Sequence, residues 1–266
     1  MSESTTQRTA PGSSEPERRH VLQELGFAVT RSGDELHGAA SVFPEMCVPE
    51  TAHLRTSILA AWADMLTGLL AVDAFAPRVP VTLELDVHLF RPAPGKGAVR
   101  GVGRVVKTGR SVFVAAVEFT RGDGKPICFG AASFMTAPDL TLTMTSPTSV
   151  DRLAPPSGRL SVPFAERAGC ERRGPGHAVF SRSEEALNAS NTVNGGLIAL
   201  GVEEAVLSLT PGATLSSLGL RYLQPVRYGP VEATAEVQEG LGRIEVRDAG
   251  NEHRLCVVAS SRIFGD

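Results

Sequence analysis

The sequence predicts an α+β fold made of two tandem copies of one unit, each an antiparallel sheet wrapped around a central helix. One observation is order: an apolar helical segment followed by strand-like runs occurs once in each half of the 266 residues. The other is a repeated set of turn residues, in which Pro92 corresponds to Pro225 and Gly97 to Gly229. Two such units usually pair, so we expect an intramolecular pseudo-dimer.

The same alignment extends into the later strands of each half. It sets LDVHLFRPAPGKGAVRGVGRVVKTGRSVFV against LGLRYLQPVRYGPVEATAEVQEGLGRIEV. Gly109-Arg110 then corresponds to Gly242-Arg243, which predicts an arginine at the tip of a hairpin in both halves. Cys128 corresponds to Cys256, so we expect both cysteines to be packing residues and not nucleophiles.

The elements of the first unit follow from their apolar patterns. EPERRHVLQELGF predicts a short amphipathic helix, and FAVTRSGDELHGAASVF predicts two strands around a Gly-Asp turn. LRTSILAAWADMLTGLLA predicts a longer helix with a broad apolar face. Strands are predicted at 81–90, 99–106, 112–119 and 126–136, separated by Gly, Pro and Lys.

The domain organisation follows from composition along the chain. Residues 1–18 are mostly polar and are predicted to be a disordered tail. The first unit is expected at 19–137 and the second at 172–266. Residues 138–171 are rich in Pro, Ser and Thr without a sustained period, which predicts a linker that contributes little to the core.

Charge and composition exclude several kinds of partner. The formal net charge is only -3, so no basic field indicates nucleic acid, and we expect no apolar run long enough to span a membrane. The four cysteines are widely spaced and no signal peptide precedes them, which favours reduced thiols and a cytoplasmic protein. The six histidines have no metal-binding spacing, so we expect no metal.

The stretch NASNTVNGGLIALGVEEA places a glycine turn and acids around an apolar helix. Asn188 stands six residues before Asn194, Gly195-Gly196 follow, and Glu203 stands nine residues after Asn194. This spacing resembles the hotdog-fold acyl-CoA thioesterases of the phenylacetate-pathway and 4-hydroxybenzoyl-CoA type, with Asn in place of the family's His. The resemblance covers nearly everything from about residue 19 onward and implies two tandem hotdog folds.

The first half keeps only part of this motif. In the same register Asp64 takes the acid position, Arg55 replaces the His, Thr56-Ser57 replace the glycine pair and Pro49 replaces the Asn. The first unit therefore keeps the family's carboxylate, and the second keeps its turn. In related dimers, the resemblance implies, each site takes its turn from one hotdog and its acid from the other.

Crossing the two halves gives a favoured first site, in which Asn188, Asn194 and Gly195 meet Asp64, with Thr82 as a hydroxyl partner. Thioester hydrolysis builds negative charge on the carbonyl oxygen, and a helix N-terminus offers free N–H groups to stabilise it. The carboxylate of Asp64 would attack the carbonyl or deprotonate a water. The amide of Asn188 could hold the water or the carbonyl.

The second candidate site joins Arg55 and Thr56 to Glu203 and lacks an amide at Pro49. A simpler interpretation makes Arg55 a helix-start residue that pairs with Glu203 or Asp64 and plugs this site. By itself, the pair Glu203-Glu204 would be typical of a solvated helix face, and the Asn-Gly-Gly stretch of an ordinary loop-to-helix junction.

The resemblance implies a hydrolase, a thioesterase that cleaves acyl-CoA or an acyl group on a carrier protein. Its CoA or phosphopantetheine arm would be part of the substrate, so no separate cofactor is expected, and a homodimer of double hotdogs is a candidate assembly. The alternatives are a catalytically silent acyl-thioester-binding or regulatory protein, and a hotdog hydratase or dehydratase, whose His signatures are absent. Four residues are the candidates for contacts with the substrate or CoA: Gly196, Arg110, Ser111 and Arg243.

Overall fold

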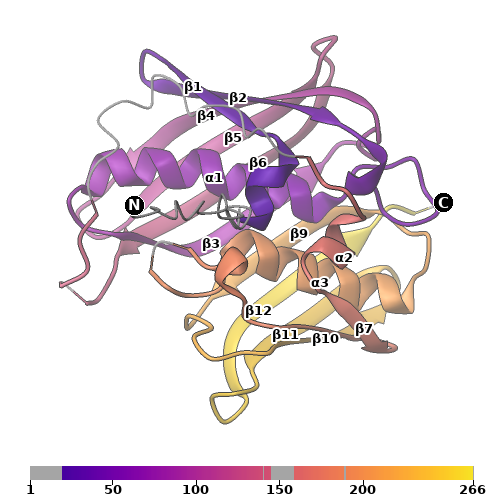
Figure 1. The fold of residues 1–266 in the computed structure, drawn as a ribbon. Helices are drawn as coiled ribbons and strands as arrows, with labels where there is room; N and C mark the ends of the chain where they lie inside the picture. The colour runs from indigo at the N-terminus through magenta and orange to yellow at the C-terminus, as the bar shows by residue number, and fades with distance from the viewer. Residues whose placement is uncertain (1–19, 140, 145–158, 189, 266) are drawn as a thin grey trace, which may run out of the picture.

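The computed structural model describes residues 20–139, 141–144, 159–188 and 190–265, so the expected tail at 1–18 lies outside it. These residues form one antiparallel sheet of twelve strands with two long helices packed against it. Figure 1 shows each of these helices lying against the strands of its own half of the chain. The fold is that of a double hotdog, as the sequence predicts.

Each half contains a long helix, six strands and two short helices. In the first half these are η1 (Val21–Leu25), β1 (Ala28–Ser32), β2 (Glu35–Val42), η2 (Pro44–Met46), α1 (Thr56–Phe75), β3 (Pro80–Leu89), β4 (Gly97–Thr108), β5 (Phe113–Arg121) and β6 (Pro126–Thr136). In the second half they are α2 (Phe164–Arg167), β7 (Glu171–Gly174), β8 (His177–Phe180), η3 (Glu184–Ala186), α3 (Gly195–Leu209), β9 (Leu215–Tyr222), β10 (Val231–Gln238), β11 (Leu241–Asp248) and β12 (Arg254–Ile263).

The two halves have the same strand order, which confirms the repeat. The order across the sheet is β1-β2-β4-β5-β6-β3 and then β9-β12-β11-β10-β8-β7, so the halves meet where β3 pairs with β9. Asp86 lies opposite Gly219 in this pairing, and the offset that aligns Pro92 with Pro225 also aligns these two residues. A pseudo-twofold axis therefore passes through this pair. A Cβ on Gly219 would stand 2.6 Å from the Asp86 carboxylate, which explains the glycine.

The predicted alignment of the hairpins is wrong. Gly242 and Arg243 lie inside β11, opposite Val237 and Glu236, whereas Arg110 lies in the turn between β4 and β5. The reason is length, since β4 has 12 residues and β10 has 8, so the first hairpin extends further before it turns. An insertion of this kind shifts a local sequence match without changing the strand order.

The two cysteines of the last strands are buried, as expected for packing residues. Their predicted correspondence is one residue out, because Cys128 lies opposite Leu89 whereas Val257 lies opposite Tyr222, the equivalent of Leu89. Burial raises the pKa of both thiols, Cys128 and Cys256. Neither thiol is suited to act as a nucleophile.

The expectation that no apolar run is long enough to cross a membrane is wrong for helix α1. Its 20 residues have a mean hydropathy of 1.6 in their most apolar window, which satisfies that criterion by length and composition. However, 61% of the window is buried inside the fold. A helix that is apolar on nearly all sides is expected where a sheet wraps around it, so the core accounts for the composition of α1.

The described part of the linker contributes to the core, contrary to expectation. Leu160, Phe164 and Cys170 are buried, and Phe164 in the short helix α2 is completely buried. Arg167 in the same helix pairs with Glu24 from the first half. Residues 159–170 therefore hold the two halves together, and residues 145–158 lie outside the described part of the chain.

Phe164→Ala should lower the free energy of unfolding by about 3 to 5 kcal/mol, because it removes a fully buried ring that the surrounding core cannot replace. Phe90→Ala is the control, since Phe90 is 57% exposed and the same truncation there should change stability far less. Urea denaturation of both variants measures the difference. Equal effects would mean that residues 159–170 are not part of the core.

Candidate active site

Helices α1 and α3 pack against each other so that the acid of each lies at the N-terminus of the other. Asp64 of α1 lies beside Gly195, the first residue of α3. Glu203 of α3 lies at Thr56, the first residue of α1. Two equivalent sites therefore occur around the pseudo-twofold axis, and each combines residues of both halves.

The N-terminus of α3 forms one wall of the first site. Asn194 is the residue before the helix, and its Oδ1 accepts a hydrogen bond from the Gly196 N–H at 2.8 Å. A Cβ on Gly196 would stand 2.7 Å from the Cβ of Ala61, so only glycine lets α3 approach α1 this closely. Asn194 therefore caps the helix, and the N–H of Gly195 has no hydrogen bond to the residues that the structure describes.

Asp64 faces this helix start from α1. One carboxylate oxygen, Oδ1, accepts a hydrogen bond from the Thr82 hydroxyl at 3.1 Å. The other, Oδ2, lies 3.5 Å from the point where a Cβ on Gly195 would stand. Burial raises the pKa of Asp64 to about 6, although the Thr82 hydrogen bond acts in the opposite direction. The site therefore holds a carboxylate of increased basicity next to a helix N-terminus.

Tyr222, at the end of β9, completes the first site and was not predicted from the sequence. Its hydroxyl donates a hydrogen bond to the Gly195 carbonyl at 3.1 Å. Burial, together with the charge of Asp64, raises the pKa of Tyr222 well above its usual range, so the hydroxyl stays protonated. The sequence does contain a difference that could have indicated Tyr222. The equivalent residue of the first half is Leu89, so only the second half has a tyrosine three residues before the shared proline.

Asn188 has a different position from the one expected. It is exposed, and its Oδ1 accepts hydrogen bonds from the N–H groups of Ser190 and Thr192, at 2.9 and 3.2 Å. Its side chain therefore orders the loop that leads to Asn194. No hydrogen bond connects it to Asp64 in the described part of the chain, so the expectation that its amide holds the substrate has no contact to support it.

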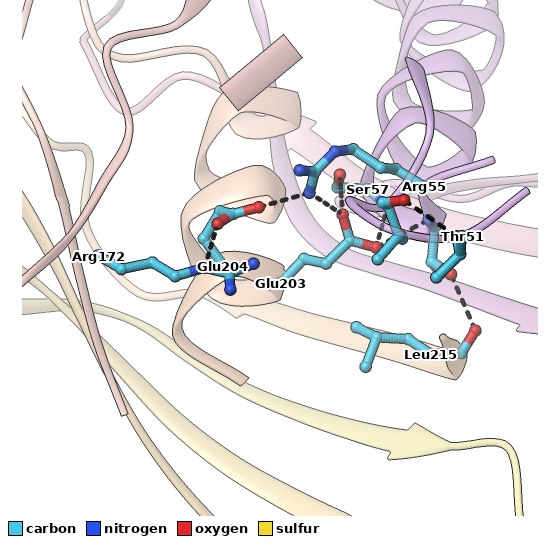
Figure 2. Close-up of polar contacts among 9 residues, drawn as sticks. Thr51, Arg55, Ser57, Arg172, Glu203, Glu204 and Leu215 are labelled. Atoms are coloured by element: carbon cyan, nitrogen blue, oxygen red, sulfur yellow. Dashed lines mark hydrogen bonds and ion pairs between the residues drawn. The ribbon is translucent and has the colours of Figure 1, made fainter. Parts of the chain in front are cut away.

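The second site is filled by the carboxylate of Glu203 (Figure 2). Glu203 Oε1 accepts the N–H groups of Thr56 and Ser57 at 2.8 and 3.3 Å, and Oε2 accepts the Ser57 hydroxyl at 2.7 Å. Thr56 donates its own hydroxyl to the Leu215 carbonyl at 2.8 Å. The N-terminus of α1 is thus occupied by a side chain of the protein itself.

Arg55 balances the buried charge of this network. Its Nη1 lies 3.1 Å from Glu203 and 2.6 Å from Glu204, and Arg172 binds the other oxygen of Glu204 at 2.6 Å. Burial lowers the pKa of Arg55, but the charges of Glu203 and Glu204 outweigh this effect and the pKa lies above its usual value. The simpler interpretation, in which Arg55 forms an ion pair that blocks this site, is therefore confirmed. Its partner is Glu203 and not Asp64. Glu204 is buried, so the interpretation as a solvated face is wrong.

The three candidates for substrate contact other than Gly196 lie on or between strands and not at a helix start. Arg110 and Ser111 are exposed at the turn between β4 and β5, and Arg243 is exposed on β11. Within the residues that the structure describes, no hydrogen bond or ion pair links them to Asp64 or Gly195. No cluster of three His, Cys, Asp or Glu side chains suited to a metal ion occurs among those same residues.

Comparison with known proteins agrees with this architecture. Residues 54–128, which include Asp64 and Thr82, match the family described as the thioesterase superfamily. No curated protein matches the chain.

Several solved structures share the fold over nearly the whole chain. An acyl-ACP thioesterase from Bacteroides thetaiotaomicron has 14% identity and a TM-score of 0.62, with 87% of this chain and 98% of that chain covered. The 12:0-ACP thioesterase from Umbellularia californica has 12% identity and a TM-score of 0.65, with coverage of 89% and 99%. The tesB protein of Mycobacterium avium subs paratuberculosis has 14% identity and a TM-score of 0.59, with coverage of 92% and 97%. The chain is therefore a double-hotdog protein whose first repeat matches the thioesterase superfamily.

Proposed function

We propose that this protein hydrolyses acyl thioesters at the site formed by Asp64 and the N-terminus of α3. The observation that carries this proposal is the difference between two equivalent sites in one molecule. The helix start of the second site binds the carboxylate of Glu203. At the first site the equivalent acid is Asp64, which is one methylene shorter and makes no hydrogen bond to the N–H of Gly195 among the described residues.

The second site indicates which ligand such a helix start accepts. Two backbone N–H groups there, from Thr56 and Ser57, converge on one negatively charged oxygen. The tetrahedral intermediate of thioester hydrolysis carries an oxygen of the same charge. At the first site we place that oxygen at the N–H of Gly195, where the positive end of the helix dipole would add to the stabilisation.

Asp64 would supply the second requirement of the reaction, a base or a nucleophile. As a base it takes a proton from water while the water oxygen bonds to the carbonyl carbon, and the C–S bond then breaks to release the acid and the thiol. As a nucleophile its oxygen bonds to the carbonyl carbon while the C–S bond breaks and the thiol leaves, and water then cleaves the resulting mixed anhydride, which frees the acid and restores Asp64. Thr82 orients the carboxylate in either route. Tyr222 fixes the peptide that follows Gly195, and so holds the helix start in place.

The thiol carrier is proposed to be CoA or the phosphopantetheine arm of an acyl carrier protein. The similar structures named as acyl-ACP thioesterases support this class of substrate. Contact of Arg110 and Ser111 with the carrier stays a prediction, as do a cytoplasmic location and a homodimer of double hotdogs. Arg243 is a weaker candidate because it does not lie at a hairpin tip.

The test is a hydrolysis assay on acyl-CoA and acyl-carrier-protein substrates, with release of the free thiol as the readout. Hydrolysis that depends on Asp64 supports the proposal. Binding without turnover would indicate the silent binding protein instead, and loss or gain of water across the acyl chain would indicate a hydratase or dehydratase.

Asp64→Asn should slow the chemical step by about 10²-fold or more, because it removes the base or nucleophile. In the wild type, kcat/KM should rise with pH through about 6, where Asp64 ionises, and then level off. Single-turnover rates against pH measure both effects. Near-normal turnover per folded molecule in the variant would contradict the mechanism.

The same variant should be more stable than the wild type at pH 7.5. The pKa of Asp64 is raised in the folded state, from 3.8 to about 6, so the folded protein keeps this proton longer than the unfolded chain and loses stability as pH rises between these values. The substitution Asp64→Asn removes a destabilisation of up to about 3 kcal/mol at pH 7.5 and of only about 0.5 kcal/mol near pH 4. Melting curves at the two pH values give the difference.

Asp64→Glu should also lose about 10²-fold in turnover although it keeps a carboxylate. The longer side chain would reach the N–H of Gly195, as Glu203 reaches Thr56, and would occupy the place of the oxyanion. Thr82→Ser is the control, since it keeps the hydroxyl that orients the acid. Wild-type turnover by Asp64→Glu would show that the helix start is not the oxyanion site.

Glu203→Gln should leave turnover per folded molecule close to that of the wild type, while it costs on the order of 3 kcal/mol of stability, because Arg55 loses a buried partner. Glu171→Gln, in an exposed pair with Arg173, should change stability little. Turnover and urea denaturation are measured on the same preparations. A loss of turnover equal to that of Asp64→Asn would mean that the second site also works.

A further inference from the structure

Gly68 is a glycine in the middle of α1 for which packing offers no reason. Glycine in a helix interior destabilises the helix relative to alanine. The glycines of α3 have a steric explanation, since a Cβ on Gly196 would stand 2.7 Å from Ala61 and one on Gly201 would stand 3.0 Å from Phe180. A Cβ on Gly68 would meet only two atoms within 4 Å, both of the Phe134 ring, at ordinary contact distances of 3.8 and 4.0 Å. The fold would therefore accept a side chain at this position.

The position lies next to the proposed catalytic carboxylate. Gly68 follows Asp64 by four residues, so the two share one face of α1. Side chains on a helix lean toward its N-terminus, so a side chain at 68 would cover the space beside Asp64. Phe134 lies directly opposite Thr82 in the pairing of β3 with β6, so its side chain and the Thr82 hydroxyl project from the same face of the sheet. One small region beside the Asp64 carboxylate is therefore bordered by four residues: Asp64, Thr82, Phe134 and Gly68.

The side chains that continue from this region along α1 are apolar, and two of them, Phe134 and Phe113, are buried at 2% and 0% exposure. The ring of Phe134 lies 6.3 Å from that of Phe113, which lies 6.0 Å from that of Phe75, and Phe75 is two turns beyond Gly68 on α1. Helix α1 carries no charged residue from 65 to 72. Met65 and Leu69 in this segment are only partly buried. A ligand group that runs from Asp64 along this side of α1 would meet hydrocarbon, which matches an apolar acyl chain and not a polar one.

We propose that Gly68 keeps open the space beside Asp64 that receives an apolar acyl chain, so that the residue at 68 determines which acyl groups the enzyme accepts. This inference rests on the proposed thioesterase function and adds the substrate class. Because glycine has no side chain, it leaves a volume beside Asp64 that the first carbons of the acyl chain can occupy. Long apolar acyl groups depend on this volume more than an acetyl group does.

The test compares wild type, Gly68→Ala and Gly68→Leu on acetyl-, hexanoyl- and lauroyl-CoA and on the same acyl groups attached to an acyl carrier protein. Gly68→Leu should lower the ratio of kcat/KM for lauroyl over acetyl substrates by at least about tenfold, with an intermediate effect for Gly68→Ala. Gly68→Ala should also melt at a higher temperature than the wild type, because alanine favours the helix. Ala39→Leu, at an exposed position of β2 away from this segment of α1, is the control and should leave the ratio unchanged.

Binding measurements separate this inference from the proposed function. Calorimetry with acetyl-CoA and lauroyl-CoA is carried out on Asp64→Asn with and without Gly68→Leu, where turnover does not interfere. Weaker lauroyl binding caused by Gly68→Leu, relative to acetyl, supports the acyl site even if the wild type hydrolyses nothing, in which case only the proposed function fails. An unchanged ratio in both the kinetic and the binding experiments overturns the role of Gly68, as does an equal loss for all substrates.

Discussion

The pairing of β3 with β9 is the interaction on which the rest of the structure depends. It joins two six-stranded halves into one sheet around the Asp86–Gly219 pair, and so sets the position of each long helix relative to the other. Because the axis is a pseudo-twofold, the contact of Glu203 with the N-terminus of α1 is matched by an equivalent position of Asp64 at the N-terminus of α3. Both candidate sites follow from this single arrangement, and neither half of the chain could form one alone.

The two sites satisfy the same physical requirement in opposite ways. Helix N-termini leave N–H groups without partners, and in a buried position these groups must be satisfied. In the second site Glu203 reaches two of them, and Arg55 neutralises the resulting buried charge. In the first site Asn194 caps one N–H group and Asp64 stops short of the helix. The second site satisfies its helix start with protein groups, whereas in the first site, among the described residues, a donor is left without such a partner beside a carboxylate of raised pKa.

Under the proposed function the two sites therefore have different roles, the first in activity and the second in structure. The raised pKa of Asp64 is a direct sign that the folded state holds this carboxylate at a cost in free energy. The glycine at position 68 is a second unfavourable choice in the same helix. Asp64 and Gly68 lie about one helical turn apart. Two unfavourable residues so close together are expected where a proposed function, and not folding, determines which residues occur. The network around Glu203 and the core contacts of Phe164 lie elsewhere and contribute to the stability that offsets them.

The sequence by itself determined the repeated architecture and the two central helices, because apolar periodicity, turn residues and motif spacing are local properties of the chain. The crossing of Asp64 with the turn at Gly195 was implied by the resemblance to the hotdog thioesterases and not by these local patterns. Only the tertiary structure decided which site is open, since that depends on whether a side chain spans the gap between two helices: Glu203 does so and Asp64 does not. It likewise placed Tyr222 at Gly195 and shifted the hairpin alignment at Arg243. These contacts join residues distant in the chain, and a difference of one methylene or of a few inserted residues changes them while leaving the local pattern the same.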